Sequence, residues 1–86
     1  MTNYKLSSNL AISDNGFLFL STTGETFTVN DIAKVVLMDL KNDINYKSIF
    51  DKLLKEYEVE EKILERDLED FFNQLNVYNL LEEKWK

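Results

Sequence analysis

The sequence has 86 residues, 44% of them hydrophobic and 30% charged, a length that allows one small domain with a single core. It contains no Cys and no His, which excludes disulfides and thiolate or imidazole chemistry, so we expect no enzyme activity, no metal site and no cofactor. Its net charge of −6 disfavours nucleic acid and anionic membranes as partners and favours a protein or peptide.

Three short strand-like segments, residues 4–13, 17–21 and 25–29, come first in the chain. In the first, largely apolar and polar residues alternate with the period of two that is typical of a half-buried strand, and residues 7–9 are the weak point of this pattern. A short turn-forming segment that ends in glycine separates each strand from the next. Two tight turns predict an antiparallel meander.

The second strand is apolar on both of its faces, because residues 17–20 read Phe-Leu-Phe-Leu. We expect one of its faces to pack on helices and the other to need separate cover. Tyr4, Leu6 and neighbouring strand residues are one source of that cover. A homodimer or a partner surface is the other.

The third strand is polar on one face and largely apolar on the other. Phe27 and Val29 point one way, while Thr26 and Thr28 point the other. Only helical patterns follow, so no later strand is evident to cover its edge. An open strand edge offers unpaired main-chain groups to another chain.

Three helices are predicted after the strands. Asn30 is a suitable N-cap for the first, which runs to about Lys41, and Asn45 for the second. The core-facing side of the third helix is an arc of apolar residues, and Asn79 is suited to end that helix. The arc consists of Leu64, Leu68, Phe71, Phe72, Leu75 and Tyr78.

We expect residues 1–86 to form one domain, with the sheet in residues 1–29, the helices in 30–81 and a frayed tail in 82–86 that includes Trp85. The N-terminus lacks the apolar core of a signal peptide. No run approaches the ~20 apolar residues that span a bilayer. A cytoplasmic protein without a membrane partner is therefore expected.

The order and spacing of these elements resemble the PqqD family from Tyr4 to Leu81. The third strand ends in a hydrophobic residue plus Asn, as in that family, and an acidic residue plus Tyr ends the second helix. The third helix carries an acidic-apolar pair, an aromatic position and a closing leucine pair. In this sequence the motifs read Phe27-Thr28-Val29-Asn30, Glu56-Tyr57, Asp67-Leu68, Phe71-Phe72 and Leu80-Leu81. The chain departs from the family at Asn42-Asp43 and Asn79, where glycine is common, although Asn tolerates positive φ.

The resemblance implies an α+β, winged-helix-like fold: an N-terminal three-stranded antiparallel sheet followed by a three-helix bundle. It also implies a peptide chaperone that binds the leader segment of a ribosomally synthesised precursor peptide. The partner enzyme that modifies the peptide is often a radical enzyme using S-adenosylmethionine. In relatives the leader adds as a strand beside the third strand, in the groove between that strand and the third helix.

Carried onto this sequence, the strand side of the groove consists of Glu25, Thr26, Phe27, Thr28 and Val29. On the helix side, we expect Ile63, Asp67, Phe71 and Gln74, since Ile63 is an apolar residue off the core arc. The alternatives are that Ile63 is simply an exposed apolar residue and that Phe71 belongs to the core. If the helix is rotated, the opposite wall applies, which consists of Glu65, Glu69, Phe72 and Asn76.

Two rival functions remain open from the sequence. A DNA-binding winged helix would place the third helix in a groove of the duplex, yet acidic residues outnumber Lys62 and Arg66 there. A small adaptor or dimerisation module would instead use an apolar outer sheet face formed by Leu18 and Leu20. An enzyme ranks third, because the acidic clusters follow helix surfaces and not the spacing of a ligand loop.

Overall fold

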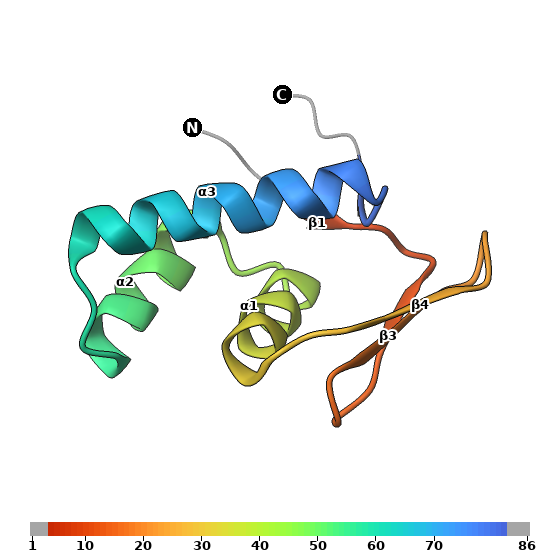
Figure 1. Ribbon diagram of the computed structural model, residues 1–86, viewed down its shortest axis with the longest axis horizontal. Coiled ribbons are helices and arrows are strands. Elements are labelled where there is room, and N and C mark those ends of the chain that lie inside the picture. Colours follow the sequence, from red (N-terminus) through yellow and green to blue (C-terminus); the bar gives the residue numbers. More distant parts are fainter. Residues whose placement is uncertain (1–3, 83–86) are drawn as a thin grey trace.

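The computed structural model describes residues 4–82, and the α+β class predicted from the sequence is confirmed (Figure 1). The sheet lies at one end of the molecule, and α3 runs across α1 and α2. The elements in chain order are β1 (Lys5–Leu6), β2 (Leu10–Ile12), β3 (Phe17–Leu20), β4 (Glu25–Thr28), α1 (Asp31–Lys41), α2 (Tyr46–Glu56), α3 (Glu61–Val77) and β5 (Leu81–Glu82).

The three-stranded sheet is the expected antiparallel meander, with strand order β2-β3-β4. Gly16 and Gly24 lie in its two turns with φ values of 84° and 78°, a region that favours glycine. A Cβ atom on Gly16 would also approach the carbonyl oxygen of Val29 to 2.8 Å. This turn therefore holds the end of β4 close to the start of β3.

The first predicted strand is wrong as a single element, because it divides into β1 and β2. Ser7 donates its N–H to the carbonyl oxygen of Leu80 at 2.9 Å, and β1 pairs with β5 rather than with the main sheet. Glu82 was expected in a frayed tail, but it lies in β5 opposite Lys5. The rest of the predicted tail, with Trp85, lies outside the described residues.

The two faces of β3 differ sharply in exposure. Leu18 and Leu20 are buried against the helices, whereas Phe17 and Phe19 are 55% and 45% exposed on the outer face. The prediction that Leu18 and Leu20 form the outer face is therefore wrong. Phe17 and Phe19 form it instead. Tyr4 packs on Phe72 of α3, so it does not cover the outer face.

Side-chain caps define the starts of α1 and α2, as predicted. The Oδ1 atoms of Asn30 and Asn45 accept N–H groups of the first turns of α1 and α2, both at 2.8 Å. Asn79 has φ 62° and ends the helical region, after which Leu80 returns to the core. The buried core joins all three helices to the sheet: Leu6, Leu10, Leu18, Leu20, Val36, Leu37, Leu40, Ile49, Leu53, Leu64, Leu68, Phe72, Leu75 and Leu80.

Candidate functional site

The outer edge of β4 presents unpaired main-chain groups. Val29 donates its N–H to the carbonyl oxygen of Gly16 at 2.9 Å, so the alternation of an antiparallel ladder also turns the main-chain groups of Phe27 towards β3. The N–H and C=O groups of Thr26 and Thr28 consequently face away from β3. No strand within residues 4–82 pairs with this edge, because the late strand β5 pairs with β1.

An aromatic contact fixes which side of α3 faces β4. The rings of Phe27 and Tyr78 lie 5.3 Å apart between centroids, with planes inclined at 58°. Tyr78 was placed on the core arc by its spacing, but it is 51% exposed and lies just past the end of α3. Gln74 and Phe71 precede it by one and two helical turns, so the flank of α3 that contains them is the one directed to β4.

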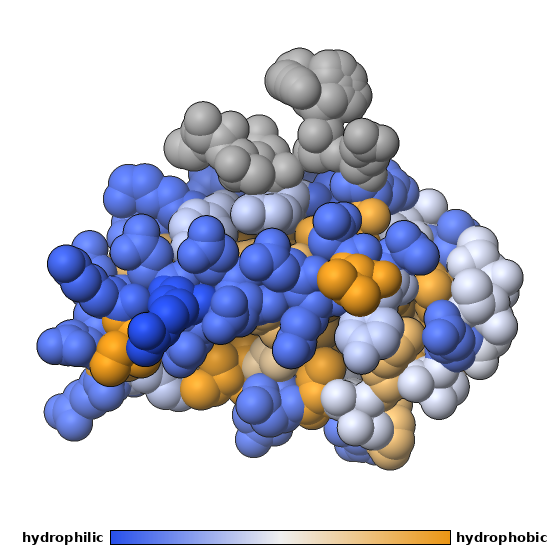
Figure 2. All heavy atoms as spheres, turned by 45° about the horizontal axis from the view of Figure 1, so that its top comes forward, coloured by the Kyte–Doolittle hydropathy of each residue, from blue (hydrophilic) through white to orange (hydrophobic). Residues whose placement is uncertain are grey.

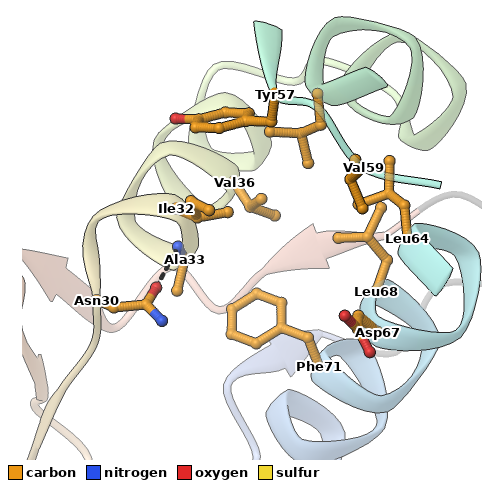
Figure 3. Close-up of a pocket in the computed structure, with 11 residues that line it drawn as sticks. Asn30, Ile32, Ala33, Val36, Tyr57, Val59, Leu64, Asp67, Leu68 and Phe71 are labelled. Carbon is orange, nitrogen blue, oxygen red and sulfur yellow. Dashed lines mark hydrogen bonds between the residues drawn. The ribbon is translucent and has the colours of Figure 1, made fainter. Parts of the chain in front are cut away.

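A pocket of about 300 Å³ continues this line beyond the end of β4 (Figure 3). It lies between the start of α1, the end of α2 and the part of α3 from Leu64 to Phe71. The ring of Phe71 points into it towards Ala33, and Asp67 and Asn30 bring polar groups to a lining that is otherwise mainly apolar. The lining residues are Asn30, Ile32, Ala33, Val36, Leu53, Tyr57, Val59, Leu64, Asp67, Leu68 and Phe71.

The opposite flank of α3 faces a different part of the molecule. Phe72 stacks on Tyr4 with ring centroids 4.1 Å apart, and it is 2% exposed. Glu65 and Glu69 line a separate hollow of about 130 Å³ with Tyr4 and Tyr46. Burial raises the pKa of Tyr46 above its ordinary value, and Tyr4 and the two carboxylates add to the effect. This flank, proposed as the alternative wall, does not face β4.

The structure brings only some of the predicted site residues together. Asp67 and Phe71 line the pocket, whereas Gln74 lies exposed further along the same flank. Ile63 is 41% exposed and is not part of the pocket lining. The carboxylate of Glu25 accepts a hydrogen bond from the Thr23 hydroxyl at 3.0 Å.

The sequence prediction missed the α1 and α2 sides of the pocket. Ile32 and Tyr57 belong to it and are 44% and 37% exposed. The available signal was the composition of residues 32–40, which are apolar except for Lys34 and Asp39, more apolar side chains than one core-facing side of a helix can hold.

The exposed surface of α3 is mostly hydrophilic (Figure 2). Within the described residues, no group of three or more acidic side chains is placed to hold a metal ion. In the same range, no helix combines the length and hydrophobicity needed to cross a membrane. The site thus consists of a free strand edge and a mainly apolar pocket in one small α+β domain.

The sequence model of the PqqD family, described as coenzyme PQQ synthesis protein D, matches residues 16–81. The chain belongs to this family, and the predicted resemblance is confirmed. None of the curated proteins matches it.

Two solved structures are similar over nearly their whole length. TbiB1 in complex with the TbiA(beta) leader peptide is 28% identical with a TM-score of 0.83, and the match covers 95% of this chain and 99% of that one. Lasso peptide synthetase B1 complexed with the leader peptide is 24% identical with a TM-score of 0.82, and the match covers 95% of this chain and 100% of that one.

Proposed function

We propose that this protein binds the leader segment of a ribosomally synthesised precursor peptide by strand addition to β4 and presents it to a modifying enzyme. The observation that carries the proposal is the free edge at Thr26 and Thr28 beside the pocket that contains Phe71. Membership of the PqqD family and the likeness to two leader-peptide complexes support it.

The strand edge supplies affinity with little sequence preference. Thr26 and Thr28 together offer two N–H donors and two C=O acceptors, and a guest strand satisfies all four. At roughly 0.5–1.5 kcal/mol net for each hydrogen bond, they do not offset the ordering of five or six peptide residues at ~1–2 kcal/mol each. Buried side chains of the peptide must supply the remaining free energy.

The pocket beside Phe71 is the place for such an anchor. A dry apolar cavity of about 150 Å³ is enough to hold benzene, so a volume of about 300 Å³ accommodates a large aliphatic or aromatic side chain. Full burial of such a side chain contributes about 1.5–3 kcal/mol. A leader with an apolar residue beyond its strand segment therefore fits this site best.

The charged groups near the groove favour a basic peptide. Asp67 lines the pocket and Glu25 begins β4, and the protein carries a net charge of −6. Both carboxylates are exposed, so an ion pair with Lys or Arg of the leader contributes at most ~1 kcal/mol. Charge thus steers the peptide, and the apolar anchor holds it.

The chemistry on the peptide belongs to a partner in this proposal. The chain has no Cys and no His, and the mainly apolar pocket gathers no acid-base pair. We place the chain as a non-catalytic presenter in the cytoplasm, and the expected partner is a radical enzyme that uses S-adenosylmethionine.

The test is a fluorescence-anisotropy titration with a labelled leader peptide, taken from a short precursor gene identified by searching next to the gene for this chain. Phe27→Asp places a charge against Tyr78 and is expected to weaken binding at least tenfold, with a smaller loss for Ile63→Asp. Glu69→Ala on the opposite flank is the control and should bind normally. Circular dichroism verifies that each variant is folded. Unchanged affinity in both Asp variants rejects this groove, and no binding by the wild-type protein rejects the function.

A further inference from the structure

The outer face of the main sheet is an exposed aromatic surface. Phe17 and Phe19 lie two residues apart on the central strand, so their side chains stand about 7 Å from each other on one face. In the register, Phe19 lies between Ala11 and Thr26, and Phe17 lies opposite Thr28. All five residues are exposed. We refer to them as the outer sheet face.

This face carries no charged side chain, although 30% of the residues in the chain are charged. A sheet face that only meets water normally carries polar and charged residues at the outward positions. Clustered aromatics on an uncharged surface are instead typical of the centre of protein interfaces, where charged residues are depleted.

We propose that the outer sheet face is the docking surface for the enzyme that acts on the bound precursor peptide, an inference that rests on the proposed function. Thr26 and Thr28 connect the two sites, because their side chains belong to this face and their main-chain groups form the free edge. A guest strand on β4 extends the face by one strand, and its alternate side chains then point the same way as Thr26 and Thr28. An enzyme seated over Phe17 and Phe19 thus contacts the guest peptide as well.

A second copy of this chain fits the face less well. Three strands of about four residues cover on the order of 200 Å², given ~3.3 Å per residue and ~4.8 Å between strands. A stable interface buries ~800 Å² per partner. Two copies would also bring together net charges of −6 each. The enzyme gains the missing area from the peptide, which it must bind in any case.

The test compares Phe17→Ser/Phe19→Ser with the control Met38→Ser/Ile44→Ser, which removes apolar residues of 37% and 39% exposure outside the sheet. Every enzyme that a search finds encoded next to the gene for this chain is measured by biolayer interferometry against the immobilised chain, with and without saturating leader peptide. We expect one enzyme to bind the loaded chain more tightly than the empty one. The Phe double variant should lose at least tenfold in that affinity, while the control variant keeps it.

The peptide titration separates this inference from the proposed function. If the wild-type chain binds no leader peptide, the proposed function fails. If the wild-type chain binds the peptide but none of the tested enzymes, the outer sheet face is not the docking surface. The same conclusion follows if the Phe double variant binds the enzyme as tightly as the control variant does. Sedimentation of the chain alone should show a monomer. A dimer that the Phe double variant abolishes would assign the face to a second copy and overturn the inference.

Discussion

Phe71 and Phe72 are neighbours in the chain, yet they lie in opposite environments on α3. Phe72 is buried and stacks on Tyr4, whereas Phe71 is half-buried and points into the pocket next to Asp67. One flank of the helix therefore holds the fold together, and the other leaves apolar surface open for a ligand. A step of 100° around the helix separates the two tasks.

The largest expected effect is on the packed flank. Phe72→Ala removes a buried ring that stacks on Tyr4, and we expect a loss of about 3–5 kcal/mol in the free energy of unfolding, measured by urea denaturation. Phe71→Ala is the matched control and should lose about 1–2 kcal/mol, because its ring is only half-buried. Equal losses in the two variants would contradict the division between the flanks.

On the open flank, we expect the main effect on peptide binding and not on stability. Phe71→Ala removes the ring from the pocket, and we expect leader-peptide affinity to fall roughly tenfold, which corresponds to about 1.4 kcal/mol. The measurement is the anisotropy titration, with Glu69→Ala as the control on the other flank. Full affinity in folded Phe71→Ala would show that the pocket does not hold the anchor.

Proline substitutions in β4 should have a smaller effect on peptide binding, and that effect depends on whether the lost N–H faces outward or faces β3. Thr26→Pro removes an N–H that faces away from β3, which an edge strand tolerates, and should weaken peptide binding roughly fivefold without unfolding the protein. Phe27→Pro removes an N–H that faces β3 and should destabilise the hairpin. Thermal denaturation and peptide titration of both variants test this contrast. The reverse result would mean that the main-chain groups of Phe27, and not those of Thr26 and Thr28, face outward.

The smallest effect concerns Tyr46, the first residue of α2, which lies against the packed flank of α3. Its pKa is raised above 10.0 by burial, with contributions from Tyr4, Glu65 and Glu69, so the folded state binds the phenolic proton more tightly than the unfolded state. This stability is fully present below pH 10 and is lost as the pH rises through the folded-state pKa. Tyr46→Phe should therefore lose less thermal stability than the wild type between pH 9 and 11. Parallel curves of melting temperature against pH would contradict it.

Much of the fold was predictable because it depends on short-range interactions. The Asn30 and Asn45 side chains cap helices three residues away, and Asn79 takes a positive φ that its own side chain tolerates. The division of the first strand was not predictable in this way. It depends on the hydrogen bond from Ser7 to Leu80, whose residues are far apart in the sequence.

The candidate site was predicted only in part, for a related reason. The edge of β4 was predicted to be open because no later strand was evident; a later strand, β5, does exist, but it pairs with β1 and leaves that edge open. Asp67 and Phe71 do line the pocket. The pocket walls from α1 and α2, with Ile32 and Tyr57, escaped prediction because helix packing creates them. Their exposed apolar side chains have no periodicity of their own that would set them apart from core residues.

The sequence by itself determined the order of the main sheet's strands and the three helices, the two turns of the sheet, the caps of α1 and α2, and the family, because these depend on neighbouring residues and their spacing. Only the tertiary structure decided which face of Phe17–Leu20 is outside and which flank of α3 faces β4. Residues 17–20 are apolar at both parities, so local pattern gives no preference between the two orientations. The choice comes from packing against the helices, which buries Leu18 and Leu20 and brings Tyr78 onto Phe27.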